Sequence, residues 1–330
     1  MGPLDKPIVQ FGLVVLVILL LPLVMQSGIL ATEILIFAMV VAACNLLLGY
    51  TGLLSFGQGI FFGIGTYVAG ICLTRWSVPV PLVLGGAALL GAVIASFVGW
   101  LSIRRQGVYF VMLTLAFSQL FYFLAYTFSG LTGGDNGLLG VPRPSLGGQE
   151  LNAPWAYYTY VAICFLVIFA LLIMVTQSTF GRTLIAIREN EGRAAAIGFP
   201  TKLFKIEAFA ISGAVTAFGG ALHAMLIGVA PLSNIEFHTS ELIIIMTIIG
   251  GSSSLFGSVL GAGFYLILAD TLSSVWPRWL LLLGLVLVAT GLFLQRGLWG
   301  LVERLYELAT SRRRASSPPE KETPQEGASK

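Results

Sequence analysis

Charged residues are scarce in this sequence. Only 10% of its 330 residues are Asp, Glu, Lys or Arg, whereas 57% are hydrophobic, and the mean hydropathy is +0.92. A soluble globular domain carries roughly 25% charged residues, so this chain cannot cover its surface with polar groups in water. Lipid must be the solvent for most of it, and the sequence predicts an all-α polytopic membrane protein.

Residues that build catalytic and metal sites are also rare. The three cysteines, Cys44, Cys72 and Cys164, lie in apolar stretches at spacings that suit neither a disulfide framework nor a zinc site. The two histidines, His223 and His238, lack metal-ligand spacing. The sequence contains no G-x-x-x-x-G-K-[ST], H-E-x-x-H or G-x-S-x-G motif. We therefore expect no cofactor, no metal and no catalytic residue, and the chain cannot hydrolyse ATP in the P-loop manner.

Long apolar runs are what the sequence has in abundance. A helix needs about 20 apolar residues, at ~1.5 Å each, to cross ~30 Å of hydrocarbon. One further apolar stretch, 241–270, is interrupted from Gly250 to Ser254. The candidate full spans are 8–25, 29–49, 52–73, 80–102, 107–129, 156–176, 207–229 and 279–295.

The basic residues predict the orientation, because Lys and Arg accumulate in short cytoplasmic loops. With the N-terminus inside, the outside receives only Arg75, Arg143 and Arg278. Both termini are then expected in the cytoplasm. The cytoplasmic side receives Lys6, Arg104, Arg105, Arg182, Arg188, Arg193, Lys202, Lys205, Arg296, Arg304 and Arg312 to Arg314.

This orientation constrains the interrupted stretch, which has to start and finish outside. Two half-helices of about ten residues, roughly 15 Å each, satisfy this as a re-entrant pair or as two short tilted spans, 241–249 and 258–269. About eight full spans plus this broken pair give about ten membrane helices. Because broken helices survive in lipid only where protein or a water-filled cavity satisfies their backbone, this region is a candidate wall of a pathway.

A weak internal repeat is also visible. Phe56-Gly57 precedes Gly63 to Tyr67 much as Phe256-Gly257 precedes Gly261 to Tyr265. Repeated halves that meet at a central site are common in transporters. Close helix packing at small residues explains the same glycines without a repeat.

The acidic residues avoid the middle of every predicted span. Glu33, Glu207, Glu241 and Asp270 all fall near the ends of apolar stretches. A proton- or sodium-coupled carrier usually needs an ionisable group within the membrane. The sequence thus favours energy input from elsewhere. A self-sufficient ion-coupled carrier and a membrane scaffold without cargo are the alternatives from other classes.

The inside loop 177–205 is the candidate for that energy input. Its Ala-rich composition predicts a helix over 183–197, with Gly198 as its C-cap and Pro200 blocking continuation. An interfacial helix anchored by basic side chains is one reading, but charges of both signs suit a protein partner better than an anionic membrane. These charges are on Arg188, Glu189, Glu191 and Arg193.

The remaining segments complete the predicted organisation. A transmembrane permease domain covers 1–300, and its outside loop, 130–155, is rich in Gly and Pro and therefore irregular. Residues 301–330 form a cytoplasmic helix followed by a disordered tail. The arginine run at 312–314 is expected to contact anionic membrane lipid.

Four blocks of the sequence resemble a known family. The segment GRTLIAIRENEGRAAAIG (181–198) is similar to the cytoplasmic EAA-type loop of ABC importer permeases, and specifically to the LivM-type permease subunit of branched-chain amino-acid importers. The family's motifs are matched in the same order by three further segments. The sequence departs from the pattern at Arg193, where a small residue is usual, and at Ser253-Ser254, where Gly-Ser is common. The three segments are GYTGLLSFGQGIFFGIGTYVAG (49–70), TGGDNGL (132–138) and ELIIIMTIIGGSSSLFGSVLGA (241–262).

The resemblance implies a heteromeric importer in a bacterial inner membrane. A second, LivH-like permease would complete the pathway, two cytosolic ATPases would dock on the coupling helices, and a periplasmic binding protein would deliver leucine, isoleucine or valine. Relatives of the same fold move urea, short amides or other amino acids, so these cargoes remain alternatives. Asn45, Ser55 and Gln58 could line the passage as uncharged polar groups, and interhelical hydrogen bonding is the alternative role for them.

Overall fold

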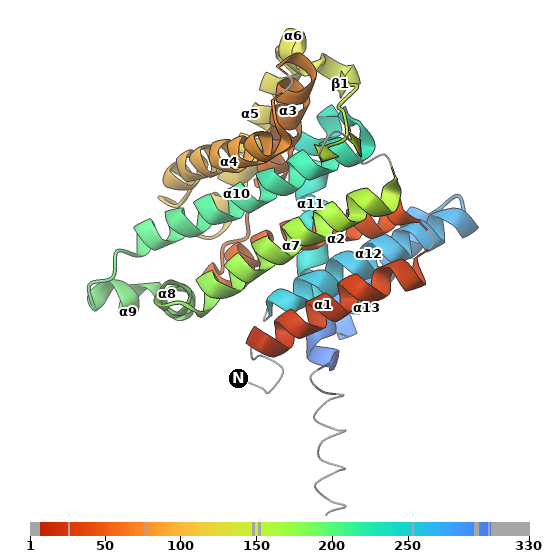
Figure 1. Cartoon of the computed structure of the whole chain (residues 1–330). Helices are drawn as coiled ribbons and strands as arrows, with labels where there is room; N and C mark the ends of the chain where they lie inside the picture. Colours follow the sequence, from red (N-terminus) through yellow and green to blue (C-terminus); the bar gives the residue numbers. More distant parts are fainter. Residues whose placement is uncertain are drawn as a thin grey trace, which may run out of the picture.

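The computed structural model describes residues 7–25, 27–76, 78–146, 149–150, 153–252, 254–293, 297–302 and 304. The predicted disordered tail, with Arg312 to Arg314, lies outside these residues, as do Lys6 and Arg296. Nearly everything described is helical (Figure 1).

The long helices fall close to the predicted spans, because the length of each apolar run sets where a helix can lie in hydrocarbon. In the described part of the chain, six helices are long and apolar enough to cross a membrane: α2 with its extension to Thr51, α4, α5, α7, α10 and α12. Shorter apolar helices coincide with α1, α11 and α13. The bounds are α1 (Pro7–Val24), α2 (Gly28–Asn45), α3 (Gln58–Arg75), α4 (Val80–Ser102), α5 (Val108–Thr127), α7 (Pro154–Gln177), α10 (Thr201–Ile227), α11 (Phe237–Gly250), α12 (Leu255–Val275) and α13 (Trp279–Phe293).

The short elements gather at the two ends of the bundle (Figure 1). At one end lie α8 (Thr179–Glu189) and α9 (Glu191–Ala196), close to the π-helix η2 (Leu46–Thr51) that extends α2. The other end holds α6 (Ser129–Thr132) and η3 (Gly134–Asn136), and there β1 (Leu138–Leu139) pairs antiparallel with β4 (Val229–Ala230). The predicted irregular loop 130–155 thus contains turns and two-residue strands, including β2 (Ser145–Leu146) and β3 (Gln149–Glu150).

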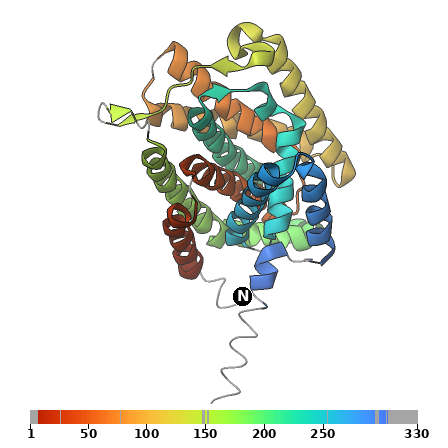
Figure 2. The same ribbon diagram turned by 90° about the vertical axis from the view of Figure 1, so that its right-hand side faces the viewer.

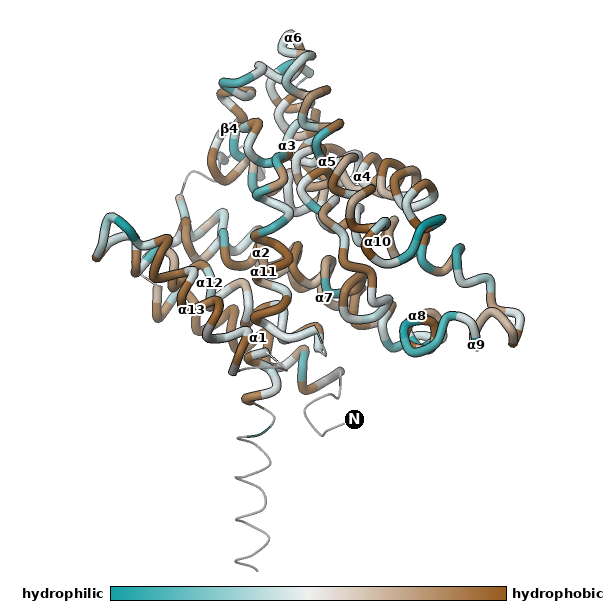
Figure 3. The backbone as a smooth tube through the Cα atoms, turned by 180° about the vertical axis from the view of Figure 1, so that it is seen from behind, coloured by the Kyte–Doolittle hydropathy of each residue, from teal (hydrophilic) through white to brown (hydrophobic). Residues whose placement is uncertain are grey.

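Helix α2 forms the centre of the bundle, and its apolar window is 83% buried. It packs against α7, α10, α11 and α12 (Figure 2). Figure 3 shows hydrophobic residues along the long helices and hydrophilic ones at α8 and the connecting loops. A helix that is apolar all round fits such a fully enclosed position.

The helices form two inverted halves. Helix α4 packs along α10 as α12 packs along α2, and α3 contacts α4 and α10 as α11 contacts α12 and α2. Helices α2, α3, α4 and α5 of one half therefore correspond in order to α10, α11, α12 and α13 of the other. Helix α2 runs toward the α8–α9 end and α10 runs away from it, so the two halves have opposite directions, as in many transporters.

The weak sequence repeat aligned the wrong helices, since it pairs the start of α3 with that of α12, whereas α3 occupies the place of α11. Both helices begin with the same local turn. The Gly57 N–H donates to Ser55 Oγ at 3.2 Å, and the Phe256 N–H donates to Ser254 Oγ at 3.2 Å. The two turns are offset by one residue in the repeat, which pairs Ser55 with Leu255, so they do not account for the similar residues.

The interrupted stretch turns at the predicted Gly/Ser run, but its helices are longer than expected. Helix α11 has 14 residues and α12 has 21. Helix α12 is therefore a full span by length, and the prediction of two ten-residue half-helices is wrong. Small residues allow α11 and α12 to pack closely against each other. At Gly261, for example, a Cβ would lie 2.1 Å from the Met246 carbonyl oxygen.

Candidate functional site

The loop between α7 and α10 folds as two helices rather than the single helix predicted over 183–197. The break falls at Asn190, whose backbone is extended (φ −157°, ψ 95°). Its side-chain oxygen accepts the Arg193 N–H at 2.9 Å and so caps α9. Asparagine is a preferred N-cap, and this signal in the sequence was overlooked.

The C-terminal boundary agrees with the prediction. Gly198 has φ +98°, and its N–H donates to the Ala195 carbonyl at 3.0 Å. The Phe199 N–H donates to the Ala194 carbonyl at 3.2 Å. These bonds end α9 at a left-handed glycine, and α10 starts after Pro200.

Replacing Gly198 by alanine is expected to destabilise this junction by about 1–2 kcal/mol, because an L side chain is strained at positive φ. A Cβ there meets nothing within 4 Å, so the effect is one of backbone alone. The measurement is thermal unfolding of the purified protein in detergent. Gly192→Ala is the matched control, since its Cβ meets only Asn190 Oδ1 at 3.5 Å. Equal unfolding temperatures for the two variants would contradict the prediction.

Helix α8 is held against the bundle by its apolar face. Leu184 and Ile187 are buried, and the rings of Phe180 and Phe204 stack at 5.5 Å. Gly181 lies directly on the backbone of Thr176, where no Cβ would fit. The loop is therefore packed against α7 and α10.

Arg188 forms a polar link from this loop into the bundle. Its guanidinium donates to the Gly49 carbonyl oxygen in η2, and its side-chain stem lies against Gly52. A cation at the C-terminal carbonyls of a helix is favourable. Arg188 thus joins α8 to the extension of the central helix α2.

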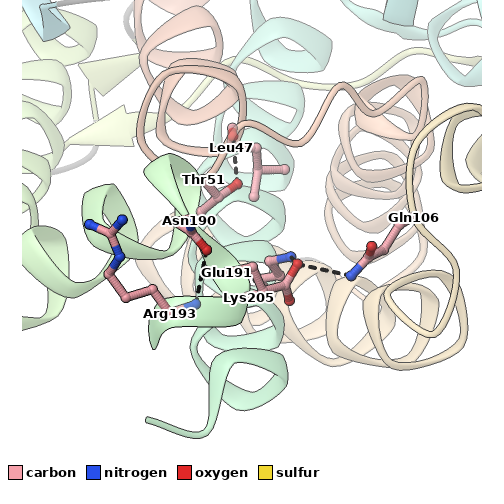
Figure 4. A network of polar contacts seen from close by, with 7 residues as sticks. All are labelled: Leu47, Thr51, Gln106, Asn190, Glu191, Arg193 and Lys205. Atoms are coloured by element: carbon pink, nitrogen blue, oxygen red, sulfur yellow. Dashed lines mark hydrogen bonds and ion pairs between the residues drawn. The ribbon is translucent and has the colours of Figure 1, made fainter. Parts of the chain in front are cut away.

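Glu191 is the second link, at the start of α9 (Figure 4). Its Oε2 lies 2.7 Å from the Lys205 ammonium of α10 and accepts a hydrogen bond from Gln106 Nε2 at 3.0 Å. The Lys205 side chain is only 8% exposed and that of Glu191 28%. Gln106 lies between α4 and α5, so one carboxylate ties α9 to three helices.

The outer face of the loop carries the other predicted residues. Glu189, Arg193 and Gly198 are exposed, and Figure 4 shows Arg193 directed away from the Glu191–Lys205 pair. Large apolar side chains accompany them, which sequence reasoning missed because it followed the charges. These are Ile197, Phe199 and Leu203, which are 71%, 45% and 57% exposed.

The three uncharged polar residues predicted for the passage lie inside this subunit. Gln58 is fully buried, donates to Ser212 Oγ at 3.0 Å and accepts from Thr216 Oγ1 at 2.8 Å. Ser55 is also buried at the start of α3. Within this subunit, Gln58 therefore serves as an interhelical hydrogen-bonding group.

Asn45 makes a similar connection on the other side of α2. It is fully buried, and its Nδ2 donates to the Ser254 carbonyl at 2.9 Å and to Ser258 Oγ at 3.2 Å. Gln10 Nε2 of α1 donates to Ser254 Oγ at 3.0 Å. The start of α12 is thus fixed by polar groups from α1 and α2.

Comparison with known proteins places this architecture in a family. The family model described as "Branched-chain amino acid transport system / permease component" matches residues 28–291. The chain belongs to this permease family. The resemblance drawn from the sequence blocks is confirmed, and the chain is a membrane permease component of an ABC-type transport system.

Individual relatives agree with this assignment. The chain is 25% identical over 291 residues to the high-affinity branched-chain amino acid transport system permease protein LivM of Escherichia coli (strain K12), covering 81% of this chain and 68% of LivM. It is 26% identical over 260 residues to LivH of Salmonella typhimurium, covering 73% of this chain and 82% of LivH. It is 26% identical over 215 residues to the autoinducer 2 import system permease protein LsrC of Salmonella typhi, covering 61% and 58%. No solved structure matches the chain.

Proposed function

We propose that this permease is the LivM-type membrane subunit of an ATP-driven importer of branched-chain amino acids in a bacterial inner membrane. The family match over residues 28–291 carries the proposal. A LivH-like second permease, two cytosolic ATPases that hydrolyse the ATP, and a periplasmic binding protein complete the importer. A relative is named for autoinducer 2 import, so cargo differs among similar permeases, and other amino acids, urea and short amides remain the alternative cargoes.

The proposed topology has ten membrane helices and both termini in the cytoplasm. Of the described cations, Arg104, Arg182, Lys202 and Lys205 lie at the α8–α9 end, whereas Arg75 donates a hydrogen bond to the Gly130 carbonyl at the opposite end. This asymmetry is what the positive-inside rule requires. The ten helices are α1 to α5, α7 and α10 to α13.

The coupling residues divide into two groups in this proposal. Glu189, Arg193 and the turn at Gly198 present the loop to an ATPase, together with the exposed Ile197 and its apolar neighbours. Arg188 and Glu191 bond to the bundle and carry the movement of the loop to α2, α10 and the α4–α5 turn. A rigid helix that docks in a partner's groove transmits its displacement through such contacts.

Asn45, Ser55 and Gln58 are proposed to hold the passage-forming helices in register. The Gln58 bonds join α3 to α10, and the Asn45 bonds join α2 to α12. These residues could contact cargo directly only in another conformation of the permease, in which their buried side chains become exposed.

Replacing Ile197 by glutamate is expected to lower co-purification of the ATPases about tenfold, because an exposed apolar anchor is replaced by a charge at the docking surface. The experiment expresses the whole importer and pulls down a tagged permease. Arg182→Glu is the control, because Arg182 is also exposed and lies earlier on α8. Unchanged ATPase recovery with Ile197→Glu would place the docking surface elsewhere.

The transport assignment itself is tested with the reconstituted importer in liposomes. ATP-dependent uptake of labelled leucine, isoleucine or valine, present only with the binding protein, is the expected result. Uptake of urea or acetamide instead would assign the alternative cargo. Uptake by this chain alone, without ATP and abolished by collapsing the proton gradient, would establish an ion-coupled carrier and overturn the proposal.

A further inference from the structure

The first turn of α11 lies at mid-depth in the bundle, although its residues stand at the end of an apolar run in the sequence. At the start of α3, Gln58 bonds Ser212 and Thr216, which are near the middle of the 27-residue α10. The next residue, Gly59, donates its N–H to Ser240 Oγ at 2.8 Å. The start of α11 is therefore level with the centre of α10, a membrane-length helix.

Helix α12 gives the same depth independently. Gly261 of α12 lies directly against Met246 of α11. Glu241 is five residues before Met246, or about 7.5 Å along the helix, and the two helices are antiparallel. Glu241 is thus level with residues 265–266, the midpoint of the 21-residue α12.

Ionisable side chains are exposed at this depth, among them Glu236 just before α11. The side chains of His238 and Glu241 are 66% and 44% exposed, with Nδ1 and Oε2 3.4 Å apart. One and two turns further along the same face lie Ile245, half-buried, and Ile248, 53% exposed. An ionised carboxylate facing hydrocarbon is costly, so this face of α11 must border water or protein.

Helix α11 packs mainly against α12, α2 and α3, and it also contacts α5 and α13, which are equivalent helices of the two inverted halves. Sites at the bilayer midplane between inverted halves are where transporters bind cargo. Glu241 stands at the end of an apolar stretch in the sequence, yet these contacts make it level with the middle of α10 and α12.

We propose that His238 and Glu241 line the translocation pathway at its midpoint, and that the Glu241 carboxylate receives the ammonium group of the cargo. This rests on the proposed function, in which the cargo is an α-amino acid with an apolar side chain. The carboxylate supplies the counter-charge for the ammonium group, and Ile245 and Ile248 supply apolar surface beside it. A carboxylate followed by isoleucines on one face therefore matches both parts of a branched-chain amino acid.

The experiment measures water access in the assembled importer in liposomes. Cys44, Cys72 and Cys164 are first replaced by serine, and Glu241→Cys, His238→Cys and Leu89→Cys are then treated with a membrane-impermeant trimethylammonium methanethiosulfonate. Leu89 is the control because it is 68% exposed midway along α4 among apolar residues. We expect the cysteines at 241 and 238 to react at least about tenfold faster than that at 89, and added leucine with the binding protein to slow the reaction at 238, where the Glu241 carboxylate is intact.

A second variant tests the charge. Glu241→Gln is expected to raise the KM for leucine uptake at least about tenfold, the usual effect of losing a charge-assisted hydrogen bond, with an unchanged amount of assembled importer. Slow labelling at 241, unchanged uptake, or loss of assembly in Glu241→Gln, which would make Glu241 a subunit-interface group, each overturn the proposal. If the wild-type importer moves none of the three amino acids, the proposed cargo fails, while labelling at 241 and 238 still decides whether α11 lines the pathway.

Discussion

Replacing Glu191 by alanine is expected to lower ATP-driven uptake at least about a hundredfold while leaving the permease in the membrane at normal abundance. The variant leaves the Lys205 ammonium, 8% exposed, without its anion, and breaking such a pair costs about 3–5 kcal/mol. Helix α9 has only six residues, so this cost falls on its local attachment instead of on the whole bundle. The loop then moves without carrying α10 and the α4–α5 turn.

A charge reversal makes the test specific. Glu191→Lys and Lys205→Glu each abolish uptake alone, whereas the double variant restores a substantial part of it, because the ion pair is rebuilt with opposite polarity. Glu207→Ala is the matched control, since Glu207 is an exposed carboxylate two residues from Lys205 on the same helix. The measurements are uptake by reconstituted importer and ATPase activity stimulated by the binding protein. Full uptake by Glu191→Ala would remove this ion pair from the coupling route.

The sequence predicted the long helices well because one physical quantity, the length of an apolar run, decides them. The run 80–102 agrees with α4 at both ends. The charges of both signs in 177–205 likewise identified the loop that forms α8 and α9 at one end of the bundle. The family emerged from short motifs whose order survives at low overall identity.

What could not be predicted depends on contacts between distant parts of the chain. Nothing near Glu191 in the sequence indicates Gln106, 85 residues away, or shows that Arg188 bonds a carbonyl 139 residues away. The four charges of the loop look alike in sequence, yet Arg188 and Glu191 bond to other parts of the bundle, whereas Glu189 and Arg193 lie exposed on the loop. The depth of Glu241 is a result of the same kind, since it follows from hydrogen bonds of Gln58 and Gly59.

Replacing Gly261 by alanine is expected to destabilise the permease by about 3 kcal/mol, the upper range for overpacking. The added Cβ would lie 2.1 Å from the Met246 carbonyl oxygen and 2.8 Å from the Gly250 Cα. Both are backbone atoms, so no rotamer change relieves the clash and α11 must move away from α12. The measurement is the thermal unfolding midpoint in detergent, alongside leucine uptake.

The same helix offers the matched control. A Cβ on Gly263 meets only Ile34 Cγ2 at 3.8 Å, an ordinary contact, so Gly263→Ala is expected to be neutral or to gain up to about 1 kcal/mol from helix propensity. Equal stability of the two variants would show that α11 and α12 are not in close contact. Because α11 carries Glu241, the displacement in Gly261→Ala should also raise the KM for leucine, whereas Gly263→Ala should leave it unchanged. Agreement of both readouts would tie the close packing of the α11–α12 hairpin to the position of the carboxylate in the passage.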